Sequence, residues 1–141
     1  RAEFAQMLVN TFNLESDGQD NPFSDVEAGA WYENAIITAY ELGVVKGRPD
    51  GTFGVNDQIS RQDMAVMTFN TLKTVGITLE LKEAAVDFKD DSEIAGYAKE
   101  AVKTMQQAGI IRGMETGEFA PLANANRAQA AVILYKLLNE L

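Results

Sequence analysis

Apolar residues recur at three- and four-residue spacing in three stretches of the chain, which begin at Arg1, Arg61 and Arg127. This spacing is typical of a helix that buries one face. We therefore expect helices over about 1–12, 61–74 and 127–138. When the three arginines are aligned, the apolar positions coincide at Phe4, Met64 and Ala130, at Ala5, Ala65 and Ala131, at Leu8, Thr68 and Leu134, and at Phe12, Leu72 and Leu138.

A different helical pattern precedes the second and third of these stretches. Residues 31–42 carry one apolar stripe and stop at Gly43, and residues 97–108 stop at Gly109 in the same way. Glycine just past a helix adopts the left-handed conformation without steric cost. The first of the two stripes consists of Trp31, Ala35, Ile36, Ala39 and Leu42.

The loop between the two kinds of helix also occurs twice, as GRPDGTFGVNDQISR over 47–61 and as GMETGEFAPLANANR over 113–127. Pro49-Asp50-Gly51 has the residue types that favour a turn, and Phe53 is expected to be buried. Ser60, with Asp63 three residues later, resembles a capping box, and Asn126 is the expected cap of the last helix. One repeat therefore consists of a first helix, a loop with one aromatic anchor, and a second helix that starts at an arginine.

These units predict an all-α fold of helix-loop-helix repeats. Residues 1–20 would hold the second helix of a truncated first repeat and a connector, 21–86 a complete repeat with a linker, and 87–141 another complete repeat. The chain starts where the first turn of a helix is expected, without its capping residue, so we expect that a preceding segment has been cut away. In the linker, Ile77, Leu79 and Leu81 alternate with polar residues, which fits a short strand or an extended segment equally well.

Composition narrows the function. Apolar residues form 46% of the 141, enough for a core, and the net charge of −9 argues against nucleic acid, whose binding depends on Lys and Arg. Cysteine and histidine are absent, which excludes disulfides, thiol chemistry and the commonest general base. No apolar run approaches the roughly 18 to 20 residues that span a bilayer, so we expect no membrane span.

One repeat contains, in order, Phe23-Ser24-Asp25-Val26, Trp31, Ala35-Ile36, Gly43-Val44-Val45-Lys46-Gly47, Pro49-Asp50-Gly51-Thr52-Phe53 and Ile59-Ser60-Arg61. In these motifs and their spacing the repeat resembles the S-layer homology (SLH) family. This resemblance implies a non-catalytic, extracellular anchor of the bacterial cell wall or S-layer that binds secondary cell-wall polysaccharide, often through a pyruvylated amino sugar. It also implies three repeats in pseudo-threefold order around a central bundle of second helices. The binding grooves of the family lie between neighbouring repeats and include the motif arginine, which Arg1, Arg61 and Arg127 match here.

The residues themselves suggest how such a ligand could be held. The guanidinium of Arg61 can bind a pyruvyl carboxylate through two parallel hydrogen bonds, and the start of its helix also favours an anion. Trp31 offers a flat face to a sugar ring, with Lys46 and Arg48 as further cations. The predicted ligand-binding set is Arg61, Trp31, Asp25, Lys46, Gly47, Arg48, Arg1 and Arg127.

Structural alternatives accompany these assignments. Trp31 could belong to the core, and Arg61 could pair with Asp63 or with the carboxylate of a neighbouring repeat. Asp25 and Asp90 could brace the turn that enters the first helix, and the glycines could serve conformation alone.

Departures from the family pattern affect the last repeat. Trp31 becomes Tyr97 there, and Pro49-Asp50-Gly51 becomes Glu115-Thr116-Gly117, which favours a mainly structural role. Of the three arginines only Arg1 is followed by Ala-Glu; the others precede Gln62-Asp63 and Ala128-Gln129. A groove next to the missing part would be incomplete unless a second copy filled it, so a homodimer is possible.

Other functions are less well supported by the sequence. Calcium loops starting at Asp50 or Asp17 lack the required glycine and glutamate, so no metal or cofactor is expected. Asp90-Asp91 is the one pair suggesting a glycosidase, but adjacent residues of an extended segment point in opposite directions. A self-assembly module remains an alternative, and an exposed stripe at Phe4, Leu8 and Phe12 would favour it.

Overall fold

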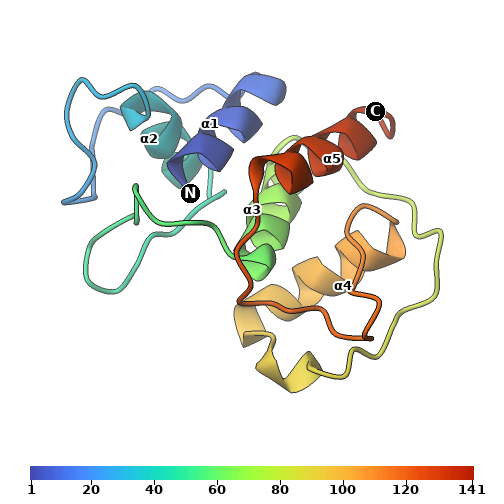
Figure 1. The fold of residues 1–141 in the computed structure, drawn as a ribbon. Coiled ribbons are helices and arrows are strands. Elements are labelled where there is room, and N and C mark those ends of the chain that lie inside the picture. Colours follow the sequence, from blue (N-terminus) through green and yellow to red (C-terminus); the bar gives the residue numbers. More distant parts are fainter.

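The computed structural model describes residues 1–141 and contains five α-helices, two short 3₁₀ helices and no strand (Figure 1). The all-α prediction is therefore confirmed. None of the helices combines the length and the apolar character that a bilayer crossing requires. The helices are α1 (Ala2–Thr11), α2 (Glu33–Glu41), α3 (Arg61–Thr74), η1 (Asp91–Glu93), η2 (Gly96–Ala98), α4 (Lys99–Gln107) and α5 (Arg127–Leu138).

The second helices begin where their caps predict. The Asn126 side chain accepts a hydrogen bond from the Gln129 N–H at 2.9 Å, and the Gln129 side chain accepts one from the Asn126 N–H, which completes a capping box. Ser60 accepts from the Asp63 N–H at 3.2 Å. The predicted return bond from Asp63 is wrong, because its carboxylate is held instead by Arg1 and by the Tyr97 hydroxyl.

The first helices are shorter than their apolar stripes. Trp31 lies in a turn ahead of α2, and Tyr97 lies in η2 ahead of α4. The linker over 75–87 forms no strand, so the extended alternative holds. The buried side chain of Gln106 fixes it by accepting from the Val86 N–H and donating to the Ala84 carbonyl, each at 3.0 Å.

Two of the second helices, α1 and α3, pack on the first helix of the following repeat. Helix α1 contacts α2, and α3 contacts both α4 and η2. In Figure 1, α3 (green) lies between the α1 and α2 pair and the α4 and α5 region. One continuous cluster of 33 buried residues runs through all of these elements. The three second helices share this core, while their threefold order and the division at 20 and 86 stay predictions.

The loops are fastened by two aspartates at equivalent positions. Asp25 accepts from the N–H groups of Phe53, Gly54 and Val55 at 2.7 to 3.1 Å. Asp90 accepts from Phe119 and Ala120, both at 2.8 Å. The two aspartates were expected to brace the turn before the first helix. Their hydrogen bonds instead hold the loop after that helix.

The aromatic anchors are buried as predicted. Phe53 and Phe119 have no exposed surface, and each packs against the phenylalanine that opens its repeat, with ring centroids 5.6 and 5.4 Å apart. Gly47 has a φ of 79°, and a Cβ built on it would lie 2.2 Å from the ring of Phe23. A side chain at this position would therefore displace the aromatic pair.

Helix α5 leaves exposed a face that α1 and α3 bury. Ala5 and Ala65 are fully buried, whereas the equivalent Ala131 is exposed. Leu72 is buried, whereas the equivalent Leu138 is 51% exposed. The equivalent faces of α1 and α3 are covered by the first helices α2 and α4. Within residues 1–141, no first helix covers this face of α5.

Candidate functional site

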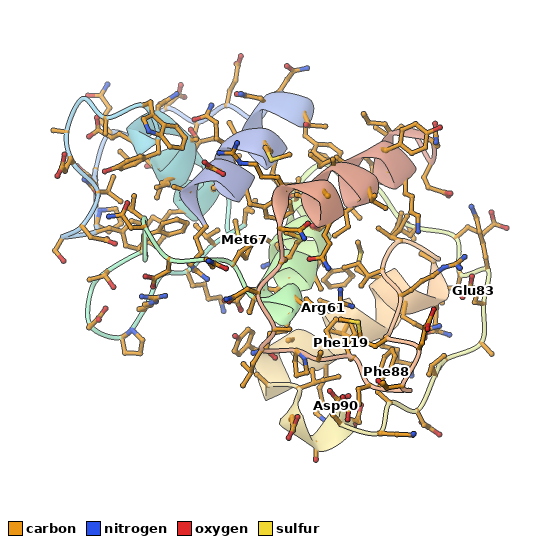
Figure 2. All side chains as sticks on the ribbon, viewed as in Figure 1. Arg61, Met67, Glu83, Phe88, Asp90 and Phe119 are labelled. Atoms are coloured by element: carbon orange, nitrogen blue, oxygen red, sulfur yellow. The ribbon has the colours of Figure 1, made fainter.

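The arginines at the starts of α1 and α3 are placed by the same contacts. The Nε of Arg1 donates to the Phe53 carbonyl at 2.9 Å, and its Cζ lies 5.0 Å from the centroid of that ring. Arg61 repeats both contacts with Phe119, at 2.9 and 4.9 Å. Stacking and the backbone bond fix each guanidinium on the loop of the following repeat, as Figure 2 shows for Arg61 and Phe119.

Two of the three motif arginines are neutralised by an acid of another second helix. Arg1 pairs with Asp63, with 2.7 Å between Nη1 and Oδ2. Arg127 pairs with Glu3, with 3.0 Å between Nε and Oε2. Each acid lies two residues after the arginine of its own helix. The starts of α1, α3 and α5 are thereby linked by charge.

Arg61 has no such partner. The residue in the corresponding place of α5 is Gln129, and Arg61 forms no ion pair within the chain. The predicted alternative of a pair with Asp63 is wrong, because Asp63 binds Arg1. Arg61 uses Nη2 to donate to the Arg112 carbonyl at 2.7 Å, and Nη1 has no hydrogen-bond partner.

The helix start at Arg61 offers no free backbone donors. The Arg61 N–H donates to the Ala123 carbonyl at 2.9 Å, and the Gln62 N–H donates to the Pro121 carbonyl at 3.0 Å. The Asp63 N–H is bound by the Ser60 cap. The expectation that these groups help to bind an anion is therefore wrong, because the loop before α5 and the Ser60 cap already occupy them.

A groove of about 540 Å³ opens where the starts of α1 and α5 face the turn before α2. We call it the Trp31 groove; it brings together three of the predicted residues, Arg1, Trp31 and Arg127, with the polar side chains of Asn56 and Gln58. Trp31 is 62% exposed and contacts Tyr32 edge to face, at 5.2 Å between centroids. The core alternative for Trp31 is therefore wrong.

A second groove of about 350 Å³, the Arg61 groove, lies between the start of α3, the segment after α4 and one side of α5. Its cations are Arg61, Arg112 and Lys136, and no aspartate or glutamate lines it. Nothing in the sequence-based set pointed to Arg112 or Lys136. Arg112 does correspond to Lys46 in the repeat register, so the repeat could have indicated it. The remaining lining residues are Ile110, Ile111, Asn126, Ala128, Gln129, Val132 and Ile133.

The other predicted residues line neither groove; Lys46, Gly47 and Arg48 lie in the loop after α2, and Asp25 lies in the turn before α2. Asp25 and Gly47 hold the loop in place, as described above. Lys46 is exposed, and Arg48 forms an ion pair with Asp57, a residue of the Trp31 groove. The structure therefore separates these four residues from Trp31 and Arg61.

Local electrostatics follow from these contacts. Burial lowers the pKa of Arg61 below its ordinary value, and the charge of nearby Asp90 offsets only part of that shift. Burial alone would raise the pKa of Asp25, but three backbone N–H bonds outweigh it and hold the pKa below its usual range. Burial, followed by the hydrogen bond to Asp63, raises the pKa of Tyr97 to about 12.

The adjacent acids Asp90 and Asp91, considered above as a catalytic pair, are both engaged in other contacts. Asp90 is engaged by two backbone N–H groups, and Asp91 pairs with Lys99 at 3.1 Å. No group of three acidic side chains is arranged to hold a metal ion.

Comparison with known proteins identifies related sequences. The chain is 36% identical over 141 residues to an amylopullulanase of Thermoanaerobacterium thermosulfurigenes, a match covering 99% of this chain and 8% of that protein. It is 30% identical over 141 residues to a surface-layer 125 kDa protein of Lysinibacillus sphaericus, covering 98% and 12%. It is 27% identical over 136 residues to a cellulosome-anchoring protein of Acetivibrio thermocellus, covering 96% and 30%.

The chain thus spans less than a third of the length of each of these relatives. A family match covers residues 22–65 and 87–131, together more than half of the chain, and is described as the S-layer homology domain. These segments contain both loops, both first helices and the starts of α3 and α5. The chain belongs to the S-layer homology domain family.

Proposed function

We propose that this chain is a non-catalytic module that attaches its parent protein to the bacterial cell wall by binding a secondary cell-wall polysaccharide, often a pyruvylated one. One observation carries the proposal. Trp31, the largest apolar side chain of the protein, is 62% exposed at a groove that also contains Arg1 and Arg127. An indole held in water beside cations and amides suits a sugar ring and its substituents.

The chemistry of the Trp31 groove agrees with a polar, uncharged ring more than with a free anion. The indole can cover the C–H face of a sugar, and the amides of Asn56 and Gln58 can exchange hydrogen bonds with its hydroxyls. The two arginines are already paired with acids.

The relatives support attachment at the cell surface. A surface-layer protein and a cellulosome-anchoring protein share this segment, and an amylopullulanase shares it over only 8% of its length. A segment common to proteins with such different names fits attachment better than catalysis. We therefore place the module outside the cell, at the cell wall or S-layer, with no catalytic role.

Co-sedimentation with cell-wall sacculi tests the proposal. We expect the wild type to bind intact sacculi and to lose binding once the secondary polymer has been extracted with acid. Trp31→Ala should weaken binding by about fivefold to thirtyfold, the effect of losing an aromatic anchor. Tyr135→Ala is the matched control, because Tyr135 is 69% exposed and lines neither groove.

Equal binding by wild type and Trp31→Ala would contradict the role of the groove. Binding that survives extraction of the polymer would contradict the polysaccharide as ligand. Circular dichroism of each variant shows whether its helices are intact.

Self-assembly is a second candidate function, and the exposed face of α5 favours it. The predicted stripe on α1 does not, because Phe4 and Leu8 are buried. On α5, Val132, Tyr135 and Leu138 are each more than half exposed. A homodimer through this face predicts a mass that rises with concentration in light scattering and falls back with Tyr135→Glu; a constant monomeric mass would exclude it.

A further inference from the structure

We infer that Glu33 is a positioning residue for Trp31, and that its carboxylate braces the turn that presents the indole to a sugar. The inference rests on the proposed polysaccharide-binding function and extends it to a residue that lines neither groove. Glu33 is the first residue of α2, two positions after Trp31. Its side chain is half-buried.

The brace is a hydrogen bond across the turn before α2. The Gly29 N–H donates to Oε2 of Glu33 at 2.8 Å. Two backbone bonds close the same turn, from the Ala30 N–H to the Glu27 carbonyl at 3.2 Å and from the Glu33 N–H to the Ala30 carbonyl at 3.1 Å. No other side chain forms a hydrogen bond with residues 27–33. Because Trp31 lies between Gly29 and Glu33, the carboxylate joins the two ends of the segment that carries the indole.

The equivalent turn of the last repeat is held from outside that repeat. In the register that aligns Trp31 with Tyr97, the residues at 29 and 33 correspond to Ala95 and Lys99. The Ala95 N–H donates at 3.0 Å to Oε1 of Gln62, a buried residue of α3. The Tyr97 hydroxyl donates to the carboxylate of the next residue of α3 at 2.7 Å. Helix α3 therefore anchors both the backbone of this turn and its aromatic side chain.

Helix α1 does not supply these anchors to the turn that carries Trp31. The residues of α1 that align with the two anchoring residues of α3 are Ala2 and Glu3. Ala2 has no polar side-chain atom, and Glu3 binds Arg127. The turn before α2 packs against α1 without a side-chain hydrogen bond from it, so Glu33 provides from within the repeat the anchor that Gln62 provides from outside in the other case.

The internal brace leaves the indole free while it restrains the backbone beneath it. Trp31 is 62% exposed, and its aromatic contact is with Tyr32, the next residue. Gly29 has a φ of 80°, and without the brace a glycine exchanges readily between this conformation and others. Ordering the turn before the ligand arrives removes an entropic cost that would otherwise weaken the contact with the sugar.

Co-sedimentation with sacculi compares three variants with the wild type. Glu33→Ala removes the brace, and we expect binding to weaken about threefold to tenfold, the effect of one hydrogen bond. Glu33→Gln keeps an oxygen that can accept from Gly29, and its binding should stay within about twofold of the wild type. Glu27→Ala is the matched control, because Glu27 is an exposed acid of the same turn whose side chain accepts no hydrogen bond within the chain. This control should bind as the wild type does.

A double-mutant cycle separates positioning from a general structural role. If Glu33 acts through the indole, Glu33→Ala should change binding by less than about twofold once Trp31 has been replaced by alanine. A general disturbance of α2 would weaken binding equally with and without the indole.

Fluorescence provides a readout that needs no ligand. Trp31 is the only tryptophan of the chain, so the anisotropy of its emission reports the nanosecond motion of this turn. The anisotropy should fall in Glu33→Ala and keep its wild-type value in Glu33→Gln and Glu27→Ala.

The outcomes separate this inference from the proposed function. Wild-type binding by Glu33→Ala, or an equal loss in the Trp31→Ala background, would overturn the inference and leave polysaccharide binding standing. Glu33→Gln as weak as Glu33→Ala would also overturn it, because the charge and not the hydrogen bond would then matter. An unchanged anisotropy in Glu33→Ala would show that the carboxylate does not restrain the turn. Failure of the wild type to bind sacculi would overturn both, since no sugar would then meet the indole.

Discussion

Residues at equivalent positions of the two repeats share a role in one case and differ in another. Asp25 and Asp90 each fasten a loop by accepting backbone N–H bonds, although the segments around them differ in sequence. Trp31 and Tyr97 precede the two first helices, yet only Tyr97 uses a polar atom, donating its hydroxyl to Asp63 at 2.7 Å. Tyr97 is as exposed as Trp31, at 65% against 62%, but its hydroxyl adds a contact between repeats that the indole lacks.

The Asp25 clamp predicts sensitivity to acid. The pKa of Asp25 is lower in the folded state than in the unfolded chain, where an aspartate has a pKa of about 3.9. The stabilisation is therefore present above that value and lost as the pH falls through the folded-state pKa. Asp25→Asn should reduce the free energy of unfolding by about 1–2 kcal/mol at pH 7, as loss of charged hydrogen bonds requires.

Urea denaturation at pH 7 and pH 3 measures this effect. The difference between wild type and Asp25→Asn should shrink at the lower pH. Asp20→Asn is the control, because Asp20 is exposed and accepts no hydrogen bond within the chain. A difference that grows on acidification would mean that the clamp does not act through the carboxylate.

The three second helices differ in how much of their apolar face is buried. Helices α1, α3 and α5 align residue by residue, but α1 lies on α2 and α3 lies on α4, whereas α5 has no such neighbour. Equivalent positions, such as Ala5, Ala65 and Ala131, are thus buried in two helices and exposed in the third. The difference comes from the neighbouring element and not from the helix itself.

A matched pair of substitutions checks this difference. Ala5→Glu places a charge at a fully buried position of α1, and Ala131→Glu places the same charge at the equivalent exposed position of α5. We expect Ala5→Glu to lower the free energy of unfolding by at least about 3 kcal/mol and Ala131→Glu to change it by less than about 0.5 kcal/mol. Comparable losses in thermal or urea unfolding would show that the α5 face is covered in solution.

The whole molecule is held together by one core rather than by a core in each repeat. The cluster of 33 buried residues includes Phe4 from α1, Met67 from α3, Met105 from α4 and Leu137 from α5. Because α1 and α3 pack on the first helix of the next repeat, these repeats do not complete their burial alone. The grooves follow from the same arrangement, since each is lined by segments from more than one repeat.

This arrangement predicts cooperative unfolding. Met105→Ala, at a fully buried position in the last repeat, should cost about 2–5 kcal/mol. It should lower the thermal midpoint seen by Trp31 fluorescence as much as the midpoint seen by far-UV circular dichroism. Two separated transitions, with the fluorescence midpoint unchanged, would indicate repeats that fold independently.

Local features were predictable because local physics decides them. The arginine starts of α3 and α5, the cap at Asn126, and the glycine ends at Gly43 and Gly109 follow from capping and backbone conformation. The burial of Phe53 and Phe119 followed from one apolar residue recurring in an otherwise polar loop. The family resemblance also depended only on the order and spacing of such residues.

Tertiary structure alone decided which charges meet and which surfaces remain open. Asp63 was expected to fold back on its own cap, yet it binds Arg1, 62 residues away in sequence. Trp31 fits an apolar stripe, yet it is exposed because α2 begins two residues later. Arg112 and Lys136 join Arg61 only through packing. Helix propensity and capping act over a few residues, whereas charge pairing and groove formation depend on contacts between distant segments, which a linear pattern does not specify.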